Sequence, residues 1–126
     1  MDPKDLKYTR TNEWCHIDGD VVTIGVTEAA AKKLHPIVYV ELPDNGDDVL
    51  SDEPFGEIES FKSVMPLYSP VDGAVIEVNT KLLDNPDPIV NDPFGKGWLV
   101  KIKAESTKQL EDLISYDEHK QLAKKT

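Results

Sequence analysis

The stretch Phe55-Gly56-Glu57-Ile58-Glu59-Ser60-Phe61-Lys62-Ser63-Val64 decides the fold, because two strand-like runs meet in it at one lysine. Residues 55–61 and 64–68 are rich in apolar and β-favouring side chains, which suit a pleated, half-buried surface. The segment between them is short enough for a hairpin tip that holds Lys62 away from the body of the protein. A lysine displayed in this way favours covalent attachment of a cofactor, because acylation of its ε-amine removes the charge and lengthens a flexible stem. Many hairpins carry a merely solvated lysine, so position alone leaves both interpretations open.

Runs of the same kind recur along the chain and predict a mainly β fold. They fall at residues 21–26, 37–42, 74–78 and 98–102. Turn signals separate them, and Asp72-Gly73 predicts a second hairpin with positive φ angles in its turn. Many short strands punctuated in this way are typical of a β-sandwich or a small barrel. We therefore expect a β core over about residues 7–103.

Two regions predict helices. Residues 27–34 form a short one, with Thr27 as the N-cap and Pro36 beyond its end. In the tail, over about residues 106–124, capping boxes that begin at Ser106 and at Ser115 predict a helix that breaks and restarts. Because there is no convincing linker, we expect residues 1–126 to form a single domain.

The composition limits the possible partners. The 24 acidic and 14 basic residues give a net charge of −10, which argues against nucleic acid and membrane surfaces and favours partners with basic patches. No apolar run approaches the roughly 20 residues of a membrane span. Cys15 is the only cysteine, which excludes an internal disulfide and favours a small buried apolar role. With a polar amino terminus unlike a targeting segment, these features predict a cytoplasmic protein.

The residues needed for catalysis or metal binding do not converge in the sequence. His16, His35 and His119 lack metal-ligand spacing, and there is no phosphate-binding glycine loop or nucleophile elbow. Glu57 and Glu59 lie on one face of a strand, where an exposed acidic surface is a better interpretation than an acid–base pair. We predict a component without catalysis of its own and without a metal.

Sequence blocks in a fixed order carry a family resemblance over nearly the whole chain. They lie at residues 7–9, 12–14, 23–27, 37–43, 56–62, 68–73, 75–79, 82–86, 90–93 and 95–99. Glu59-Ser60-Phe61-Lys62 is moderately specific alone, whereas the blocks in register are highly specific. They resemble the H protein of the glycine cleavage system, a lipoyl carrier. The resemblance implies a barrel-sandwich hybrid, the β-sandwich of lipoyl and biotinyl carriers, with the lysine at a hairpin tip and helices at the tail.

By this resemblance Lys62 would carry lipoic acid covalently. Its arm would shuttle an aminomethyl group and reducing equivalents between glycine decarboxylase, an aminomethyltransferase and dihydrolipoyl dehydrogenase, after loading by a lipoate ligase or lipoyl synthase. Thr11 and Glu13 would match the cleft positions that shelter the loaded arm, where a carboxylate would pair with its ammonium. The residues around the attachment site that would be recognised are Glu59, Ser60, Phe61, Ser63 and Val64. Biotin carriers resemble Ala-Met-Lys-Met at this point, unlike the present sequence.

Three departures from the family pattern keep other functions open. Asn12 stands for a histidine, His35-Pro36 for Gly-Asp, and Met65-Pro66 for a polar Ser-Asp pair whose carboxylate would face the amine. Val64 and Pro66 also occur in H-like lipoate-binding proteins that serve sulfur oxidation with a heterodisulfide-reductase-like complex. Carriage of sulfur intermediates, or relay of lipoyl groups, is therefore the alternative function. An unmodified binding domain is the second alternative.

Overall fold

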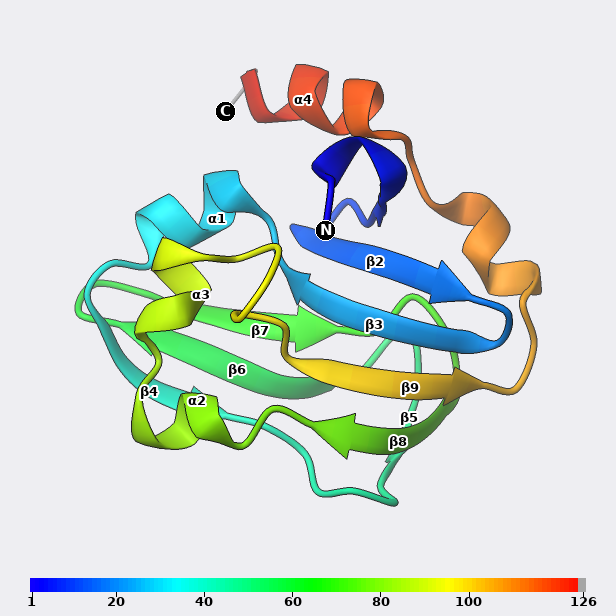
Figure 1. Cartoon of the computed structure of the whole chain (residues 1–126), viewed down its shortest axis with the longest axis horizontal. Helices are drawn as coiled ribbons and strands as arrows, with labels where there is room; N and C mark the ends of the chain where they lie inside the picture. Colours follow the sequence, from blue (N-terminus) through cyan, green and yellow to red (C-terminus); the bar gives the residue numbers. More distant parts are fainter. Residues whose placement is uncertain (125–126) are drawn as a thin grey trace.

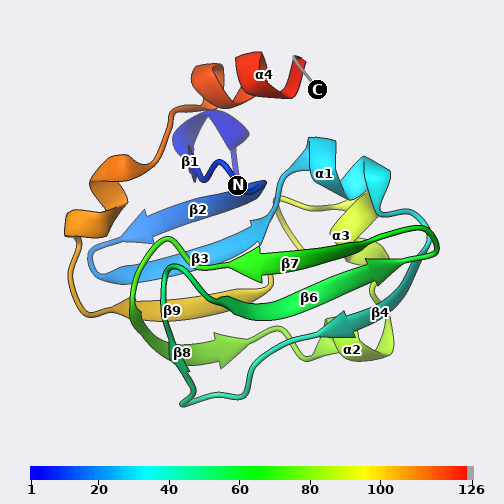
Figure 2. The same cartoon turned by 180° about the vertical axis from the view of Figure 1, so that it is seen from behind.

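Two antiparallel β-sheets pack against each other in the computed structural model, which describes residues 1–124 (Figures 1 and 2). The larger sheet has six strands in the order β1-β2-β3-β9-β8-β5, and the smaller has three in the order β4-β6-β7. The strands are β1 Lys7–Tyr8, β2 Glu13–Asp18, β3 Val21–Val26, β4 Ile37–Glu41, β5 Asp48–Val49, β6 Pro54–Ser60, β7 Val64–Tyr68, β8 Gly73–Val78 and β9 Val100–Ala104. The helical segments are η1 Pro3–Asp5, α1 Glu28–Lys33, α2 Lys81–Asp84, α3 Asp87–Asn91, η2 Lys108–Asp112 and α4 Tyr116–Lys124. The predicted mainly β sandwich is confirmed.

The predicted strands agree closely with the observed ones. β3 and β7 have the predicted bounds, β4 and β8 differ by one residue at one end, and β6 is displaced by one residue at both ends. β9 begins two residues later than expected, although the Leu99 N–H already bonds the Ile24 carbonyl at 2.8 Å. β2 was not predicted, because its apolar Trp14 and Cys15 stand between the charged Glu13 and the polar His16. The short helices α2 and α3 were also missed, since they lie in a stretch rich in proline and aspartate.

The prediction of a hairpin turn at Asp72-Gly73 was wrong. β7 belongs to the three-stranded sheet and β8 to the six-stranded sheet, so the chain crosses between the sheets here. Gly73 does not have a positive φ. A Cβ atom at this position would lie 2.2 Å from the carbonyl oxygen of Lys103, so glycine is needed for the close approach of β9.

The helix predictions were partly correct. α1 is capped as expected, because the Thr27 hydroxyl accepts a hydrogen bond from the Ala30 N–H at 3.3 Å. The tail breaks and restarts as predicted, and the Ser115 hydroxyl caps α4 through the Glu118 N–H at 3.2 Å. The capping box at Ser106 was wrong, because Gln109 turns back to the sheets and its side-chain oxygen accepts from the Asp72 N–H at 2.8 Å.

Side chains from both sheets meet in one hydrophobic core. Ile24 of β3, Ile58 of β6 and Leu67 of β7 are all fully buried in it. Full burial of such a side chain stabilises a fold by about 1.5–3 kcal/mol. Cys15 belongs to the same core, which confirms its predicted apolar role, and burial raises the pKa of its thiol.

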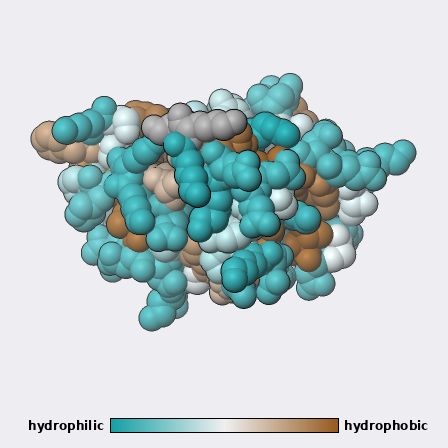
Figure 3. Space-filling view, turned by 90° about the horizontal axis from the view of Figure 1, so that it is seen from above, coloured by the Kyte–Doolittle hydropathy of each residue, from teal (hydrophilic) through white to brown (hydrophobic). Residues whose placement is uncertain are grey.

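The tail is anchored at the β1 edge of the six-stranded sheet. Tyr8 and Ile114 exchange two backbone hydrogen bonds of 2.9 Å. The ring of His119 stacks on that of Tyr8, with 4.5 Å between the ring centroids. These contacts hold α4 beside α1 (Figure 1). Hydrophilic side chains cover most of this helical side of the molecule (Figure 3). No helix within residues 1–124 is both long enough and apolar enough to cross a membrane.

A buried carboxylate joins the two sheets. Glu13 of β2 has no exposed surface, and its Oε2 accepts from the Tyr68 N–H of β7 at 3.1 Å. Its Oε1 accepts from the hydroxyls of Thr9, at 2.5 Å, and of Thr11. Burial raises the pKa of Glu13 to about 7, although the hydrogen bonds oppose the shift. The loop before β2 is thereby tied to the end of β7.

Replacing Glu13 with Gln should remove a pH dependence of stability. From about pH 4.5 to 7 the folded protein retains a proton that the unfolded chain releases, so wild-type stability should fall as the pH rises through this window. Gln stays neutral, and the threonine hydroxyls can accept from its amide. The free energy of unfolding in urea, measured at pH 5 and 7.5, should fall by about 2 kcal/mol more in the wild type than in Glu13→Gln.

A matched Glu13→Ala variant should be less stable than Glu13→Gln at both pH values, because it leaves the Tyr68 N–H buried without an acceptor. Parallel pH profiles for the wild type and Glu13→Gln would contradict this account of the Glu13 carboxylate.

Candidate functional site

The β6–β7 hairpin ends in a two-residue tip, Phe61-Lys62, that two serines close. The Ser60 N–H donates to the Ser63 carbonyl at 2.8 Å, and the Ser63 N–H donates to the Ser60 hydroxyl oxygen at 3.1 Å. Neither tip residue has a positive φ. The Phe61 N–H also bonds the Pro36 carbonyl at 3.3 Å, which ties the tip to the segment after α1.

Lys62 stands exposed at this tip, as the sequence predicted. Among the ion pairs of residues 1–124, none involves its ammonium, so the amine is not held by an acidic side chain there. An exposed, uncommitted amine on a closed turn is accessible to an acylating enzyme.

Apolar side chains and glutamates surround the tip. Phe61 is 81% exposed, and Val64, on the next strand, is 51% exposed. Glu59 lies between Tyr39 and Val64 in the strand pairing, and Ser60 is buried in the turn. The predicted recognition residues therefore fall into two groups. Ser60 shapes the turn, whereas the other four lie at the surface to different extents: Glu59, Phe61, Ser63 and Val64.

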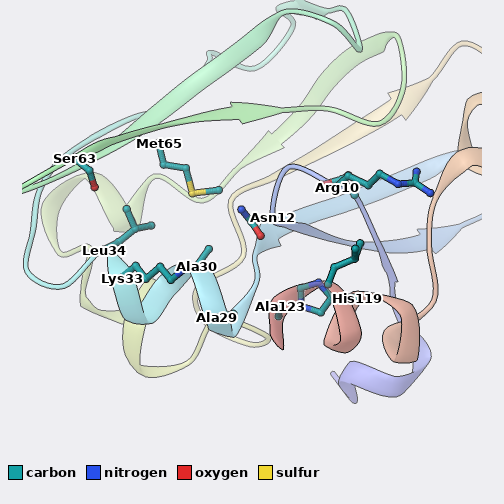
Figure 4. Close-up of a pocket in the computed structure, with 12 residues that line it drawn as sticks. Arg10, Asn12, Ala29, Ala30, Lys33, Leu34, Ser63, Met65, His119 and Ala123 are labelled. Atoms are coloured by element: carbon teal, nitrogen blue, oxygen red, sulfur yellow. The ribbon is translucent and has the colours of Figure 1, made fainter. Parts of the chain in front are cut away.

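A cleft of about 540 Å³ opens next to the tip, between β7, α1 and α4 (Figure 4). Met65 of β7 and Ser63, just before that strand, line it, and Asn12 projects into its middle. Its remaining lining residues are Thr9, Arg10, Ala29, Ala30, Lys33, Leu34, His119, Leu122 and Ala123. Sequence reasoning missed α1 and α4 as walls of this cleft, because their approach depends on the packing of the tail.

The structure places Thr11 and Glu13 differently from the prediction. Neither residue lines the cleft, and Glu13 is buried beneath its Thr9 side, bonded to both threonines. Thr11 instead lines a second cavity of about 430 Å³, together with Tyr68 and Gln109. In this structure the hydrogen bonds of Glu13 hold the loop before β2, and its pairing with the ammonium of a loaded arm stays a prediction.

The departures from the family pattern have distinct structural roles. Asn12 has a φ of 73°, a left-handed conformation that asparagine tolerates better than most residues. Met65 forms part of the cleft wall, whereas Pro66 is exposed and does not line the cleft. Pro66 lies in β7, an edge strand, where proline is tolerated. The expected effect of Pro66 on the charge of the cleft is therefore not supported by its position.

Comparison with known proteins gives one consistent result. The family model described as "Glycine cleavage H-protein" matches residues 6–126. A glycine cleavage system H protein of Staphylococcus carnosus is 46% identical over 120 residues, with 95% of each chain covered. One of Rubrobacter xylanophilus is 48% identical over 117 residues, covering 93% of this chain and 90% of the other.

A solved structure agrees. The crystal structure of a glycine cleavage system H protein from Mycobacterium marinum superposes with a TM-score of 0.86 at 35% identity, covering 96% of this chain and 98% of that chain. These relatives support the glycine cleavage interpretation over sulfur oxidation and lipoyl relay. The chain belongs to the glycine cleavage H-protein family, the lipoyl carriers of the glycine cleavage system.

Proposed function

We propose that Lys62 is the attachment site of lipoic acid, joined through an amide to its Nζ. The observation that carries the proposal is the exposed, unpaired amine on a serine-closed tip beside a cleft. An amine in the core or in a buried ion pair would be out of reach of a lipoate ligase or lipoyl synthase. The same exposure lets the side chain enter the active sites of other proteins.

The cleft next to the tip fits the attached arm at rest. Ser63, next to the attachment residue, and Met65, two residues further on in β7, both line it. Its walls include the apolar side chains of Ala30, Leu34 and Leu122, which suit an alkyl chain and a sulfur ring. We infer that Lys62 folds its arm back along β7 between turnovers.

The proposed role is transport without catalysis by the chain itself. When attached, lipoate supplies a dithiolane that takes up the aminomethyl group of glycine together with electrons. The chain tethers this group, which raises its local concentration at each partner. Glycine decarboxylase, aminomethyltransferase and dihydrolipoyl dehydrogenase are the proposed partners. A cytoplasmic location belongs to the proposal and rests on the single, buried, unpaired Cys15.

The surface around Lys62 is the proposed contact for these enzymes. Phe61 and Val64 present exposed apolar area, and Glu57 and Glu59 add negative charge on β6. A partner with an apolar opening and a basic rim would complement this surface.

Lipoylation of Lys62 can be tested by intact mass. Incubation with lipoate, ATP and a lipoate ligase should add one lipoyl increment to the wild type and none to Lys62→Arg, because guanidinium is not acylated under these conditions. Lys103→Arg, on a strand far along the chain, is the matched control and should gain the increment. The unfolding temperature of Lys62→Arg should match the wild type, since an exposed substitution changes stability by no more than about 0.5 kcal/mol. Modification of Lys62→Arg would refute the assignment.

The role of Phe61 can be tested separately. Phe61→Ser should fold normally, because the side chain is 81% exposed, yet slow lipoylation about tenfold, the size of effect expected when an interface anchor worth about 1.4 kcal/mol is removed. Leu83→Ser on α2 removes a comparable side chain, 51% exposed, outside the tip surface and should leave the rate unchanged. Equal initial rates for both variants would rule out recognition through Phe61.

A further inference from the structure

An Asn-Gly pair stands in the loop between β4 and β5, at the bottom of Figure 1. Asn45 and Gly46 are both exposed there, and a Cβ atom on Gly46 would have no neighbour within 4 Å. Asparagine followed by glycine cyclises readily, because glycine has no side chain to keep its backbone nitrogen away from the asparagine amide. The other asparagines of the chain do not precede a glycine: Asn12, Asn79, Asn85 and Asn91.

The reaction of such a pair needs only water. The Gly46 nitrogen loses its proton and forms a bond to the side-chain amide carbon of Asn45. The bond from that carbon to the amide nitrogen breaks, and the nitrogen leaves as ammonia with the proton that Gly46 gave up. Water then opens the resulting succinimide ring at either carbonyl, which leaves aspartate or isoaspartate at position 45. No atom is oxidised or reduced.

The fold holds the attacking nitrogen in a hydrogen bond. The Gly46 N–H donates to the Val75 carbonyl of β8 at 2.7 Å, and the Val75 N–H donates to the Asp47 carbonyl at 2.8 Å. These two bonds continue the β5–β8 ladder, in which Asp48 faces Ala74. While the first bond is intact, the nitrogen keeps its proton and points at β8, so it does not reach the side chain of Asn45.

We propose that Asn45 is a site of deamidation controlled by the hydrogen bond from Gly46 to Val75, so that the reaction proceeds when the loop and β5 separate from β8. β5 has only two residues and lies at the edge of the six-stranded sheet. Its buried side chain is Val49, which is 5% exposed. A short edge strand of this kind opens locally more often than the central strands do. The inference does not depend on the modification of Lys62.

Deamidation would change the surface that leads to Lys62. Asn45 lies within residues 41–59, where eight residues are acidic and none is lysine or arginine, and the product adds one more carboxylate. Isoaspartate also adds a carbon to the main chain, which shifts the two hydrogen bonds with Val75 out of register. The reaction therefore alters both the charge of this segment and its attachment to β8.

The experiment measures deamidation by mass spectrometry of the unlipoylated full-length protein kept folded at pH 8. Trypsin releases residues 34–62, in which Asn45 is the single asparagine and glutamine is absent, so a deamidated mass can be assigned to Asn45. The released peptide, incubated in the same buffer, gives the rate without the fold. The folded protein should react at least about tenfold more slowly than the peptide. Equal rates would overturn the proposal, as would a peptide that does not react.

Two matched variants distinguish local opening from unfolding of the whole chain. Val49→Ala weakens the attachment of β5 and should speed deamidation of the folded protein by roughly fivefold to thirtyfold. Val22→Ala removes the same atoms from a fully buried position on β3, which β9 separates from β8, and should change the rate by less than about twofold. Equal acceleration by the two substitutions, or none by Val49→Ala, would contradict control by β5.

Amide hydrogen exchange of Gly46, followed by NMR in the wild type, supplies a test without a variant. If one opening exposes this N–H to both reactions, its protection against exchange should match the slowing of deamidation within about threefold. An unprotected Gly46 amide would overturn the proposal. Protection far larger than the slowing of deamidation would overturn it as well, because the reaction would then proceed with the hydrogen bond closed.

Discussion

A carboxylate without solvent must be satisfied inside the protein, and Glu13 places this requirement where the two sheets meet. One oxygen takes the hydroxyls of Thr9 and Thr11, and the other takes the Tyr68 N–H of the opposite sheet. These bonds fix the loop before β2 against the end of β7, the strand that begins just after Lys62. The position of the cleft between that strand and the helices depends on this junction. Glu13, without exposed surface, therefore holds the loop that borders the site.

The attachment tip depends on a second local arrangement. Two-residue hairpin loops usually need positive φ angles and therefore Asn-Gly or similar pairs. Here the hydroxyl of Ser60 accepts the Ser63 N–H, and Phe61 and Lys62 occupy the loop without positive φ. The serines thus permit two large side chains at a position where glycine is common. This explains how an aromatic residue and the modified lysine can stand together at the end of the hairpin.

Charge is distributed unevenly over the molecule. Residues 41–59 contain eight acidic residues and no lysine or arginine, and this segment runs from the end of β4 through β6 to the tip. Lys32 and Lys33 lie on α1, and Lys120 and Lys124 lie on α4. These two helices lie near each other at the top of Figure 2. An acidic approach to Lys62 would steer partners with basic surfaces.

The sequence by itself determined the strands of the hairpin, the exposure of Lys62, the buried apolar role of Cys15 and the family, because alternation, turn residues and ordered motifs are local properties. It did not reveal that Asp72-Gly73 carries the chain between sheets, since the need for glycine comes from the carbonyl of Lys103 on a strand far along the chain. Nor did it show that Glu13 is buried or that Lys33 and His119 line the cleft. Those facts were decided only by the tertiary structure, because they depend on contacts between distant residues. Glu13 meets Tyr68 of the opposite sheet, and the tail packs on Tyr8 of β1, which brings α4 to the cleft.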